Sequence, residues 1–446
     1  MIRKYFGTDG VRGEYGVSVL TDGFAYRLGC AMGRWLLKTD APRMIVMGRD
    51  TRSSGVALRD ALASGFKAAG DFQILDLGIV PTPAVAVHVR SCKACLGVVL
   101  TASHNPAEDN GIKFFNSNGL KFSDDIELEF EALLDGVEEV DTFDAVEITE
   151  AIDGSAEYMK LLRPLLSTNS LEGMKLVVDT AHGATHVTTP SLLREFGADL
   201  YVLGDAPDGT NINQGVGSQC PGLLAETVVN QGAALGIAHD GDGDRVLFCD
   251  ANGKVLDGDV LLGILGLSEL KKGRLIDNTL VATMQSNLGL DRAMKGAGGQ
   301  LIRTDIGDRY VLDEMLRSGY SLGGENSGHI ICADVNPTGD GLLCAIKLLS
   351  ILVEEQKPLS ELQSCVTLFP QKTGAIPVNA KPPLEEIPEI QSTLASLNDE
   401  MGESGRVLLR YSGTELKIRL LVEGENESLV DAWYDVLETS VRRQLV

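Results

Sequence analysis

Short runs of β-branched residues, each ending in a polar turn, constrain the fold of this chain more than any other feature. Longer amphipathic stretches separate these runs, and this alternation is typical of α/β units. Because ligands collect at the carboxyl ends of strands in open α/β sheets, we expect the turns to assemble into one site. The predicted buried strands are Met44–Met47, Gly97–Leu100, Leu176–Val178, Ala234–Ala238, Leu280–Ala282 and Tyr320–Leu322.

The α/β rhythm stops near Pro358–Pro370, and two strands and a helix follow it. We therefore predict an α/β fold with three similar mixed-sheet α/β domains and a smaller C-terminal α+β domain, since 446 residues exceed one hydrophobic core. A domain-sized internal repeat is suspected from the recurring strand–turn pattern, and the acidic stretch Asp135–Asp153 is expected to be an exposed crossing. The predicted domains are residues 1–150, 155–252, 253–366 and 370–446.

The C-terminal elements are predicted as strands Val407–Tyr411 and Leu416–Val422 and a helix over Glu427–Arg443. Apolar residues at helical spacing in this helix are interpreted as core rather than as a ligand site. They are Leu429, Trp433, Val436, Leu437 and Val441.

The charge of the chain excludes several classes of partner. The formal net charge is −24, which disfavours binding to nucleic acid or to an anionic membrane. The N-terminus lacks the apolar core of a signal peptide, and the apolar stretch Val260–Leu267 is too short to span a bilayer. We therefore expect a cytoplasmic protein, and we interpret its cysteines, the pair Cys92 and Cys95 included, as reduced packing residues.

Residues Ala238–Arg245 read A-H-D-G-D-G-D-R and form the sharpest local signal. Asp240, Asp242 and Asp244 repel one another unless a cation gathers them, and hard oxygen ligands suit Mg²⁺, Ca²⁺ or Mn²⁺. An EF-hand is excluded, because its sixth position would be Arg245 instead of glycine and its twelfth Ala251 instead of glutamate.

The predicted strand Gly97–Leu100 runs into T-A-S-H-N-P, which contains Ser103. A serine here can simply cap a helix, and no G-x-S-x-G elbow supports acyl chemistry. A serine that accepts and returns a phosphoryl group needs only a metal and cationic donors, and Lys113 is a candidate donor or acid/base.

Two further turns carry groups suited to a phosphorylated sugar. In G-E-N-S-G-H, Glu325 and Ser327 can bracket vicinal hydroxyls, and His329 is either a contact or a core residue. In R-Y-S-G-T-E, arginines and neutral donors form a phosphate cradle without a P-loop, although a plain hairpin turn has the same pattern. The cradle residues are Arg410, Ser412, Gly413, Thr414 and Arg419.

Near the N-terminus, F-G-T-D-G-V-R-G places Arg12 in a glycine-rich loop. Alone this is a weak signal. Arg49 and Arg52 are interpreted as surface or structural residues.

These segments occur together and in a fixed order: F-G-T-D-G-V-R-G, T-A-S-H-N-P, D-G-D-G-D-R, G-E-N-S-G-H and R-Y-S-G-T-E. In this the chain resembles the α-D-phosphohexomutase superfamily over essentially its whole length, and within it most closely the phosphoglucosamine mutases. The resemblance implies four domains around a central cleft. Tyr411 and Leu416 stand where the family often has proline, and no site residue is assigned to the loop Asn211–Pro221, whose sequence departs from the family pattern.

The resemblance also implies roles for individual residues. Ser103 would be the phosphoserine nucleophile, and its phosphate would join the three aspartates in holding Mg²⁺. Arg12, Lys113 and Arg245 would serve proton transfer or organise the cleft, while the two turns described above would bind the sugar hydroxyls and the non-transferring phosphate.

The implied reaction interconverts glucosamine 6-phosphate and glucosamine 1-phosphate through glucosamine 1,6-bisphosphate, and it feeds UDP-N-acetylglucosamine and cell-wall precursor synthesis. A homodimer is expected from the resemblance. Three alternatives remain open: a phosphomannomutase or phosphoglucomutase, a noncatalytic sugar-phosphate-binding protein and a metal-dependent phosphatase.

Overall fold

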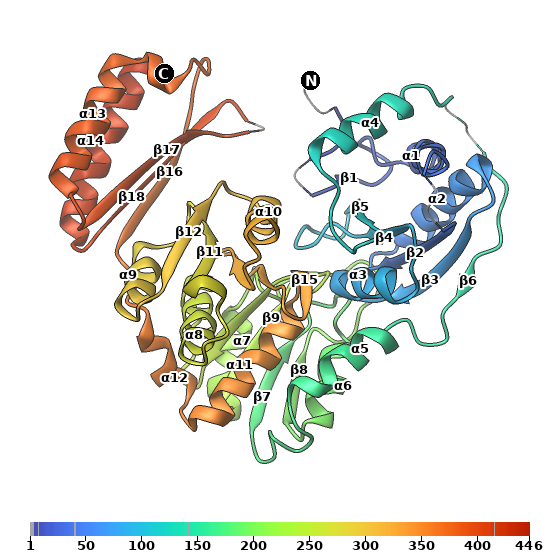
Figure 1. The fold of residues 1–446 in the computed structure, drawn as a ribbon, viewed down its shortest axis with the longest axis horizontal. Coiled ribbons are helices and arrows are strands. Elements are labelled where there is room, and N and C mark those ends of the chain that lie inside the picture. Colours follow the sequence, from blue (N-terminus) through green and yellow to red (C-terminus); the bar gives the residue numbers. More distant parts are fainter. Residues whose placement is uncertain (1–3, 8, 40–41, 139, 141, 414) are drawn as a thin grey trace.

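A computed structural model describes residues 4–7, 9–39, 42–138, 140, 142–413 and 415–446 of the chain. The chain forms four sheets with their helices, arranged in an arc that has the N-terminal and C-terminal parts at its two ends (Figure 1). The predicted fold class, three similar mixed-sheet α/β parts and a smaller C-terminal α+β part, is confirmed. The domain limits placed from the sequence stay a prediction.

The first sheet has the strand order β1-β5-β4-β2-β3-β6. β2, β3 and β4 are parallel, while β5 runs antiparallel to β4. The strands are β1 (Val11–Glu14), β2 (Met44–Arg49), β3 (Gln73–Ile79), β4 (Leu96–Leu100), β5 (Asp109–Asn116) and β6 (Thr149–Glu150).

The second and third sheets repeat the core of the first. Their orders are β10-β9-β7-β8 and β12-β11-β13-β14-β15, and in each an antiparallel strand follows the last of three parallel strands. The suspected internal repeat is therefore visible as sheet topology. The second-sheet strands are β7 (Lys175–Asp179), β8 (Asp199–Leu203), β9 (Leu235–His239) and β10 (Val246–Asp250). The third-sheet strands are β11 (Thr279–Thr283), β12 (Gln300–Thr304), β13 (Leu322–Gly324), β14 (Ile330–Cys332) and β15 (Asn336–Gly339).

Helices join the parallel strands, and side-chain caps fix where several of them begin. Thr21, Asp257, Asn287 and Asp340 each accept a bond from a backbone N–H in the first turn of the helix that follows. The helices of the first three parts are α1 (Asp22–Leu36), α2 (Gly55–Ala69), α3 (Thr82–Ser91), α4 (Asp124–Leu134), α5 (Ala156–Leu162), α6 (Thr188–Glu195), α7 (Gly222–Gln231), α8 (Gly258–Lys271), α9 (Leu288–Gly296), α10 (Asp308–Ser318), α11 (Gly341–Glu355) and α12 (Leu359–Leu362).

The buried helix α11 ties the second and third parts together. It contacts α8, β10 and β14, and its apolar face belongs to a hydrophobic core that continues through both parts and into α3 of the first. Burial of a continuous apolar core disfavours independent movement of the parts that share it. These three parts therefore form the frame on which the loops are mounted.

The C-terminal part is a three-stranded antiparallel sheet, β16-β18-β17, with both of its helices packed against it (Figure 1). It has a hydrophobic core of its own. Its elements are β16 (Gln371–Pro377), α13 (Pro388–Met401), β17 (Gly405–Tyr411), β18 (Lys417–Gly424) and α14 (Glu427–Leu445).

Two sequence predictions need correction. The strand predicted at Tyr320–Leu322 begins only at Leu322, because Gly319 closes α10 in the left-handed region and pairing with β11 starts at Gly323. On α14, Leu429 and Val436 are exposed, because Val430 and Tyr434 occupy the buried face instead. The crossing Asp135–Asp153 is mostly exposed, as predicted, and its short strand β6, which pairs with β3, is exposed as well; residues 139 and 141 lie outside the described residues.

All eight cysteines are free in the described structure. Cys95 is buried and its thiol donates to the Met44 carbonyl, whereas Cys92, Cys220 and Cys365 are exposed, so the packing interpretation is wrong for these three. Among the described residues, no helix combines the length and apolar character needed to cross a bilayer.

Candidate functional site

Three equivalent loops of the repeated fold meet at one place. Each connects the last parallel strand of its sheet to the antiparallel strand beside it: β4 to β5, β9 to β10 and β13 to β14. The first contains Ser103, the second contains Asp240–Arg245 and the third contains Glu325–His329. The sequence predicts that distant turns assemble into one site. These three turns do so because they occupy the same position in each copy of the repeated fold.

The hydroxyl of Ser103 is buried and faces the aspartate loop. Its Oγ donates to Asp240 Oδ2 at 2.6 Å, and its backbone N–H donates to Thr101 Oγ1 at 2.8 Å. The backbone φ of Ser103 is 54°, in the left-handed region that non-glycine residues rarely adopt. Left-handed non-glycine residues cluster where surrounding structure holds them for a function, and helix capping is excluded because no helix follows Ser103 before β5.

Asp240, Asp242 and Asp244 bring carboxylate oxygens within 4.8 Å of one another. All three side chains are buried, and Asp242 Oδ1 and Asp244 Oδ1 have no hydrogen-bond partner among the residues that the structure describes. Burial, reinforced by the Asp244 and Asp242 carboxylates, raises the pKa of Asp240 well above its usual value. Buried carboxylate oxygens without partners are costly, and a divalent cation with a preference for oxygen ligands satisfies them. The residues present therefore fit a hard metal ion.

Lys113, on β5, reaches the aspartate loop from the first sheet. Its Nζ lies 2.8 Å from Asp242 Oδ2, 3.2 Å from Asp244 Oδ2 and 2.9 Å from Asp9 Oδ2. Burial alone would lower the pKa of Lys113, but these carboxylates outweigh it and hold the pKa well above its usual value. Lys113 is therefore an ammonium group at neutral pH.

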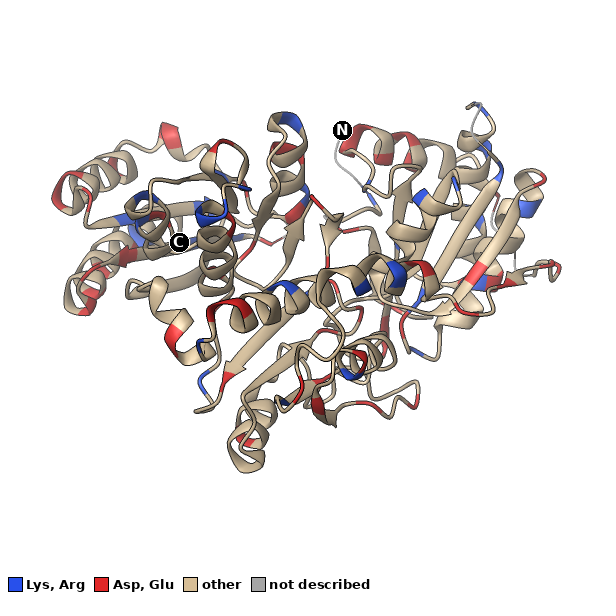
Figure 2. Ribbon diagram, turned by 60° about the horizontal axis from the view of Figure 1, so that its bottom comes forward, with Lys and Arg blue, Asp and Glu red and all other residues tan. Residues whose placement is uncertain are grey.

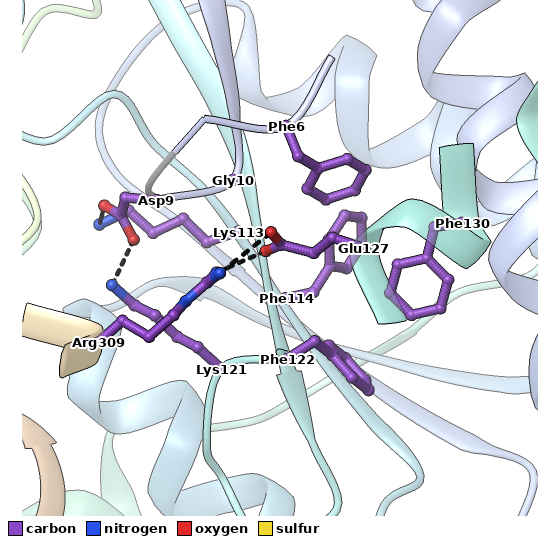
Figure 3. A pocket seen from close by; sticks show the side chains of 10 residues that line it. All are labelled: Phe6, Asp9, Gly10, Lys113, Phe114, Lys121, Phe122, Glu127, Phe130 and Arg309. Atoms are coloured by element: carbon purple, nitrogen blue, oxygen red, sulfur yellow. Dashed lines mark hydrogen bonds and ion pairs between the residues drawn. The ribbon is translucent and has the colours of Figure 1, made fainter. Parts of the chain in front are cut away.

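The contacts of Lys113 belong to a closed ring of alternating charges that joins the first three parts. Lys121 lies 2.5 Å from both Asp9 and Asp308, and the His329 ring lies between Asp308 and Asp244, at 3.4 and 3.7 Å. Figure 3 shows Asp9 and Lys121 facing each other, beside a further contact of Arg309 with Glu127. The members in order are Lys113, Asp9, Lys121, Asp308, His329 and Asp244.

His329 carries a positive charge more readily than a free histidine. Burial disfavours its charged form, but Asp244 and Asp308 outweigh this and raise its pKa. With His329 protonated, the ring holds three negative and three positive groups. His329 is buried, as the core alternative expects, and it also contacts two carboxylates of the ring.

His104 behaves in the opposite way. Burial, with Arg245 and Arg12 nearby, lowers the pKa of His104 to about 4, so its imidazole is neutral. Arg245 Nη1 donates to His104 Nδ1 at 3.0 Å, and the same Nδ1 lies 3.3 Å from Ser103 Oγ. Arg12 pairs with Asp9. The space beside the serine is thus lined with guanidinium groups.

A cavity of about 420 Å³ opens next to these groups, a volume suited to a small ligand. Glu325 lines it, and burial raises the pKa of this carboxyl. Ser327 Oγ, in the same turn, is buried and has no hydrogen-bond partner. A Cβ on Gly328 would lie 2.3 Å from the Val246 carbonyl, so the turn packs closely against the aspartate loop's strand. The other residues that line the cavity are Tyr5, Gly7, Asp9, Gly10, Arg12, His104, Asp244, Arg245, Gly307, Asp308 and His329.

The predicted phosphate cradle does not line that cavity. Arg410 and Arg419 are directly opposite each other on β17 and β18 and line a separate cavity of about 290 Å³. Ser412 is buried, Gly413 is exposed, and Thr414 lies outside the described residues. In Figure 2 the ribbon of the C-terminal part carries Lys and Arg positions on the strands of its sheet and Asp and Glu positions along its helices. Burial, together with Arg419, lowers the pKa of Arg410, and Asp305 opposes this.

Several residues of the site were missed by sequence reasoning. Thr82 Oγ1 donates to Asp242 Oδ2 at 2.6 Å, and Asp9, Lys121 and Asp308 complete the ring. Asp9 lies inside the glycine-rich motif near the N-terminus and Asp308 follows the carboxyl end of β12, so the local sequence could have indicated both as site residues. No local pattern indicates Thr82 or Lys121.

Arg52 was interpreted as surface or structural, and the surface alternative is wrong. Its guanidinium is fully buried, pairs with Asp50, and donates to four backbone carbonyls of the serine loop. The acceptors are the carbonyls of Ser103, Asn105, Pro106 and Asp109.

Four family models match the chain in sequence, and all describe phosphoglucomutase/phosphomannomutase. Domain I matches residues 3–141, domain II 156–253, domain III 257–369 and the C-terminal domain 375–438.

Solved structures share the fold over nearly the whole chain. A phosphoglucomutase/phosphomannomutase family protein from Burkholderia thailandensis is 22% identical with a TM-score of 0.81, covering 98% of this chain and 97% of its own. An N-acetylphosphoglucosamine mutase from Aspergillus fumigatus, solved with GlcNAc-6P and magnesium, is 16% identical with a TM-score of 0.66, covering 99% and 96%.

Curated relatives are closer in sequence. The phosphoglucosamine mutase of Syntrophotalea carbinolica is 43% identical over 100% of this chain and 98% of its own length. That of Streptococcus agalactiae is 44% identical over 99% of each. Given this similarity along the whole chain, the protein belongs to the phosphoglucomutase/phosphomannomutase family, and within it to the phosphoglucosamine mutases.

Proposed function

We propose that the chain interconverts glucosamine 6-phosphate and glucosamine 1-phosphate, with Ser103 as the phosphoryl carrier and glucosamine 1,6-bisphosphate as the intermediate. The observation that carries this proposal is the buried contact of 2.6 Å between Ser103 Oγ and Asp240, inside a cluster of carboxylates. The relatives named phosphoglucosamine mutase support the choice of sugar.

In the proposed site, Asp240, Asp242, Asp244 and an oxygen on Ser103 hold Mg²⁺. The ion, when bound, neutralises negative charge on the transferring phosphoryl group. The two carboxylate oxygens without partners support this assignment. Mg²⁺ is favoured over softer metals because the donors are all oxygen.

The residues around Ser103 are proposed to position the phosphoryl group and balance its charge. Lys113 stays protonated among three carboxylates, so we assign it an electrostatic role instead of that of a base. Arg12 and Arg245 line the cavity and can donate to phosphate oxygens. In the first transfer the attacking sugar oxygen gains the phosphoryl group and loses its proton, while Ser103 Oγ loses the phosphoryl group and gains a proton. In the second transfer Ser103 Oγ attacks the other phosphate of the bisphosphate and loses its proton, and the sugar oxygen that leaves gains one.

The sugar is proposed to lie in the cavity of about 420 Å³, with its hydroxyls against Glu325 and Ser327. His329, which lies beside Asp244, is proposed to contact the sugar on the side of the metal site. Both phosphates of the bisphosphate must visit Ser103, so the sugar has to turn over inside the site between the two transfers. A roomy polar cavity suits that requirement.

The C-terminal part is proposed to bind the phosphate that is not being transferred, through Arg410, Ser412, Gly413, Thr414 and Arg419. Two facing arginines are stabilised by a dianion that they share. Since Arg410 and Arg419 line a different cavity from Glu325, we propose that the C-terminal part closes over the sugar when substrate binds. Closure also excludes water, which would otherwise hydrolyse the phosphoserine.

Activity on glucose and mannose phosphates is a second candidate, because the family models are those of phosphoglucomutase and phosphomannomutase. Steady-state rates with the glucosamine, glucose and mannose 6-phosphates separate the candidates. We expect the highest kcat/KM with glucosamine 6-phosphate, and a ratio to glucose of one or less would contradict the choice of sugar. The cytoplasmic location and the homodimer stay predictions.

Mass spectrometry of the purified chain tests the mechanism. We expect one phosphate on Ser103 that disappears when glucosamine 1-phosphate or 6-phosphate is added in stoichiometric amount, with bisphosphate formed in its place. Active protein that never carries phosphate on Ser103 would overturn the proposal.

A further inference from the structure

Two side chains from different parts of the fold hold the same pair of carbonyls in the serine loop. Asn213 Nδ2 donates to the carbonyl oxygens of Ser103 and Asn105, at 2.9 Å each. Arg52 Nη2 donates to the same two oxygens at 3.1 and 2.8 Å. Arg52 comes from the first part of the chain, whereas Asn213 comes from the loop between β8 and α7 of the second, where the sequence assigned no site residue.

The amide of Asn213 lies at the junction of the serine loop and the aspartate loop. A Cβ on Gly241 would approach the Ser103 carbonyl to 2.5 Å and Asn213 Nδ2 to 2.9 Å. Only glycine allows so close an approach at this point of the metal-binding motif. The three segments are therefore packed in direct contact, and the position of the serine relative to the aspartates depends on them.

The reaction makes this contact necessary. In the described state the Ser103 hydroxyl donates to Asp240, and this bond links the two loops. Once Oγ carries a phosphoryl group it has no hydrogen left to donate, so that link is lost in half of the catalytic cycle. Contacts of the backbone carbonyls do not depend on Oγ, so they help to maintain the strained φ of 54° at Ser103 in both halves of the cycle.

We propose that Asn213 is a positioning residue that keeps the phosphorylated Ser103 loop in register with the metal-binding aspartates. This rests on the proposed phosphoserine mechanism. Its amide acts through the backbone carbonyls of Ser103 and Asn105, so the role is to hold the phosphoryl group in line for transfer. Misplacement by about 1 Å can slow a reaction by about 10²-fold.

Asn213 offers a clean test because its own backbone φ is 61°. Glycine and aspartate both tolerate this conformation, so Asn213→Gly and Asn213→Asp remove the amide without straining the loop. Gln214→Ala is the matched control, since Gln214 is the next residue, carries the same amide group and is exposed. Arg52 is unsuitable, because its removal would leave Asp50 buried without its ion-pair partner.

The measurement is a single-turnover experiment in which purified phosphorylated enzyme is mixed with glucosamine 1-phosphate and the loss of phosphoserine is followed by quenched mass spectrometry. We expect Asn213→Gly to transfer about 10- to 100-fold more slowly than wild type. Asn213→Asp should be slower still, because its carboxylate faces two carbonyl oxygens, and Gln214→Ala should match wild type. The KM for sugar phosphate should change by less than about twofold, since substrate contacts lie elsewhere.

If the loop has a purely structural role, the transfer rates should follow a different order, with Asn213→Gly and Asn213→Asp both transferring at the wild-type rate. That result would overturn the positioning role while leaving the proposed function intact. Slow transfer in all three variants would also overturn it. Wild-type protein without exchangeable phosphate on Ser103 would instead remove the proposed function, on which this inference depends.

Discussion

The serine–aspartate centre and the C-terminal arginine pair are built in opposite ways. At the centre, Ser103 and the three aspartates are buried, and charged partners from three parts of the fold surround them. In the C-terminal part, Arg410 and Arg419 face each other with like charge, and Arg419 is 47% exposed. At the centre the protein's own charged groups surround the aspartates, whereas the arginine pair has the exposed carboxylate of Glu415 beside it, 3.4 Å from Arg419.

The difference follows from the chemistry that each region is proposed to perform. Phosphoryl transfer depends on positioning and preorganised charge, which a folded core supplies without further movement. The binding of a phosphate at the far end of a sugar needs an open path for entry and release. A buried centre together with a more exposed arginine pair satisfies both demands.

The largest effect expected from this comparison is at Ser103. Removal of the nucleophile should lower turnover by more than about 10³-fold while binding of glucosamine 6-phosphate stays within about twofold. Since the φ of 54° strains an alanine, Ser103→Gly should accompany Ser103→Ala. Steady-state kinetics and calorimetry provide the two measurements. Turnover of the glycine variant above a tenth of wild type would show that the centre does not depend on this hydroxyl.

At the arginine pair, removal of one functional group should affect substrate binding. Arg410→Gln should raise the KM for sugar phosphate by about 10- to 100-fold, since one charged hydrogen bond contributes roughly 1.5–3 kcal/mol. The phosphate content of Ser103 should not change. Arg443→Gln, an exposed arginine on α14 of the same domain, is the charge-matched control. Loss of phosphoserine in Arg410→Gln would mean that the two regions are not separate.

The junction between the regions should respond to pH through Asp259. Burial raises the pKa of Asp259 to about 7, and Ser286 beside it is held through its carbonyl by Arg406 of the C-terminal part. The unfolded carboxyl releases its proton near pH 4 whereas the folded one keeps it until about pH 7, so stability should fall as pH rises through this window. The loss is at most about 4 kcal/mol.

Melting temperatures at pH 5 and pH 7.5 measure this slope. Asp259→Asn, which stays neutral, should flatten it. Parallel profiles for wild type and variant would show that Asp259 does not titrate in this range.

A smaller change in stability, measured as a shift in melting temperature, is expected when a metal ion binds at the serine–aspartate centre. Millimolar Mg²⁺ added to chelator-treated protein should raise Tm by several degrees, because a ligand at a hundred times its Kd stabilises by about 2.7 kcal/mol. Asp242→Asn should abolish the shift, and Arg410→Gln should retain it. A shift that persists in Asp242→Asn would place the ion elsewhere.

The smallest change in the free energy of unfolding is expected at Leu429 on α14, outside both regions. Leu429 is 45% exposed, so Leu429→Gln should change the unfolding free energy by less than about 0.5 kcal/mol. Trp433, on the buried face, donates through Nε1 to Glu400, and Trp433→Ala should cost about 3–5 kcal/mol. Chemical denaturation gives both values. A large cost at Leu429 would restore the sequence-based assignment of the core.

The sequence alone predicted those candidate site residues that lie together in one short segment. The three aspartates alternate with glycines within five residues, and the loop of Ser103 follows a recognisable strand, so both were predicted. Asn213, Thr82 and Lys121 act through contacts with segments more than 100 residues away. No local pattern marks such contacts, because they arise only when separate sheets pack together. On α14, helical spacing alone could not decide which of two adjacent apolar rows faces the sheet.

The ring that runs through Asp9, Lys121, Asp244 and His329 also bears on how the protein is made. A chain emerging from the ribosome presents Asp9 and the aspartate loop long before His329 has been synthesised. By then Lys113 and Lys121 are already available to Asp9, and Lys113 to Asp244, so Asp308 and His329 are the members still missing. The ring should therefore close late, after residues 308 and 329 have been translated.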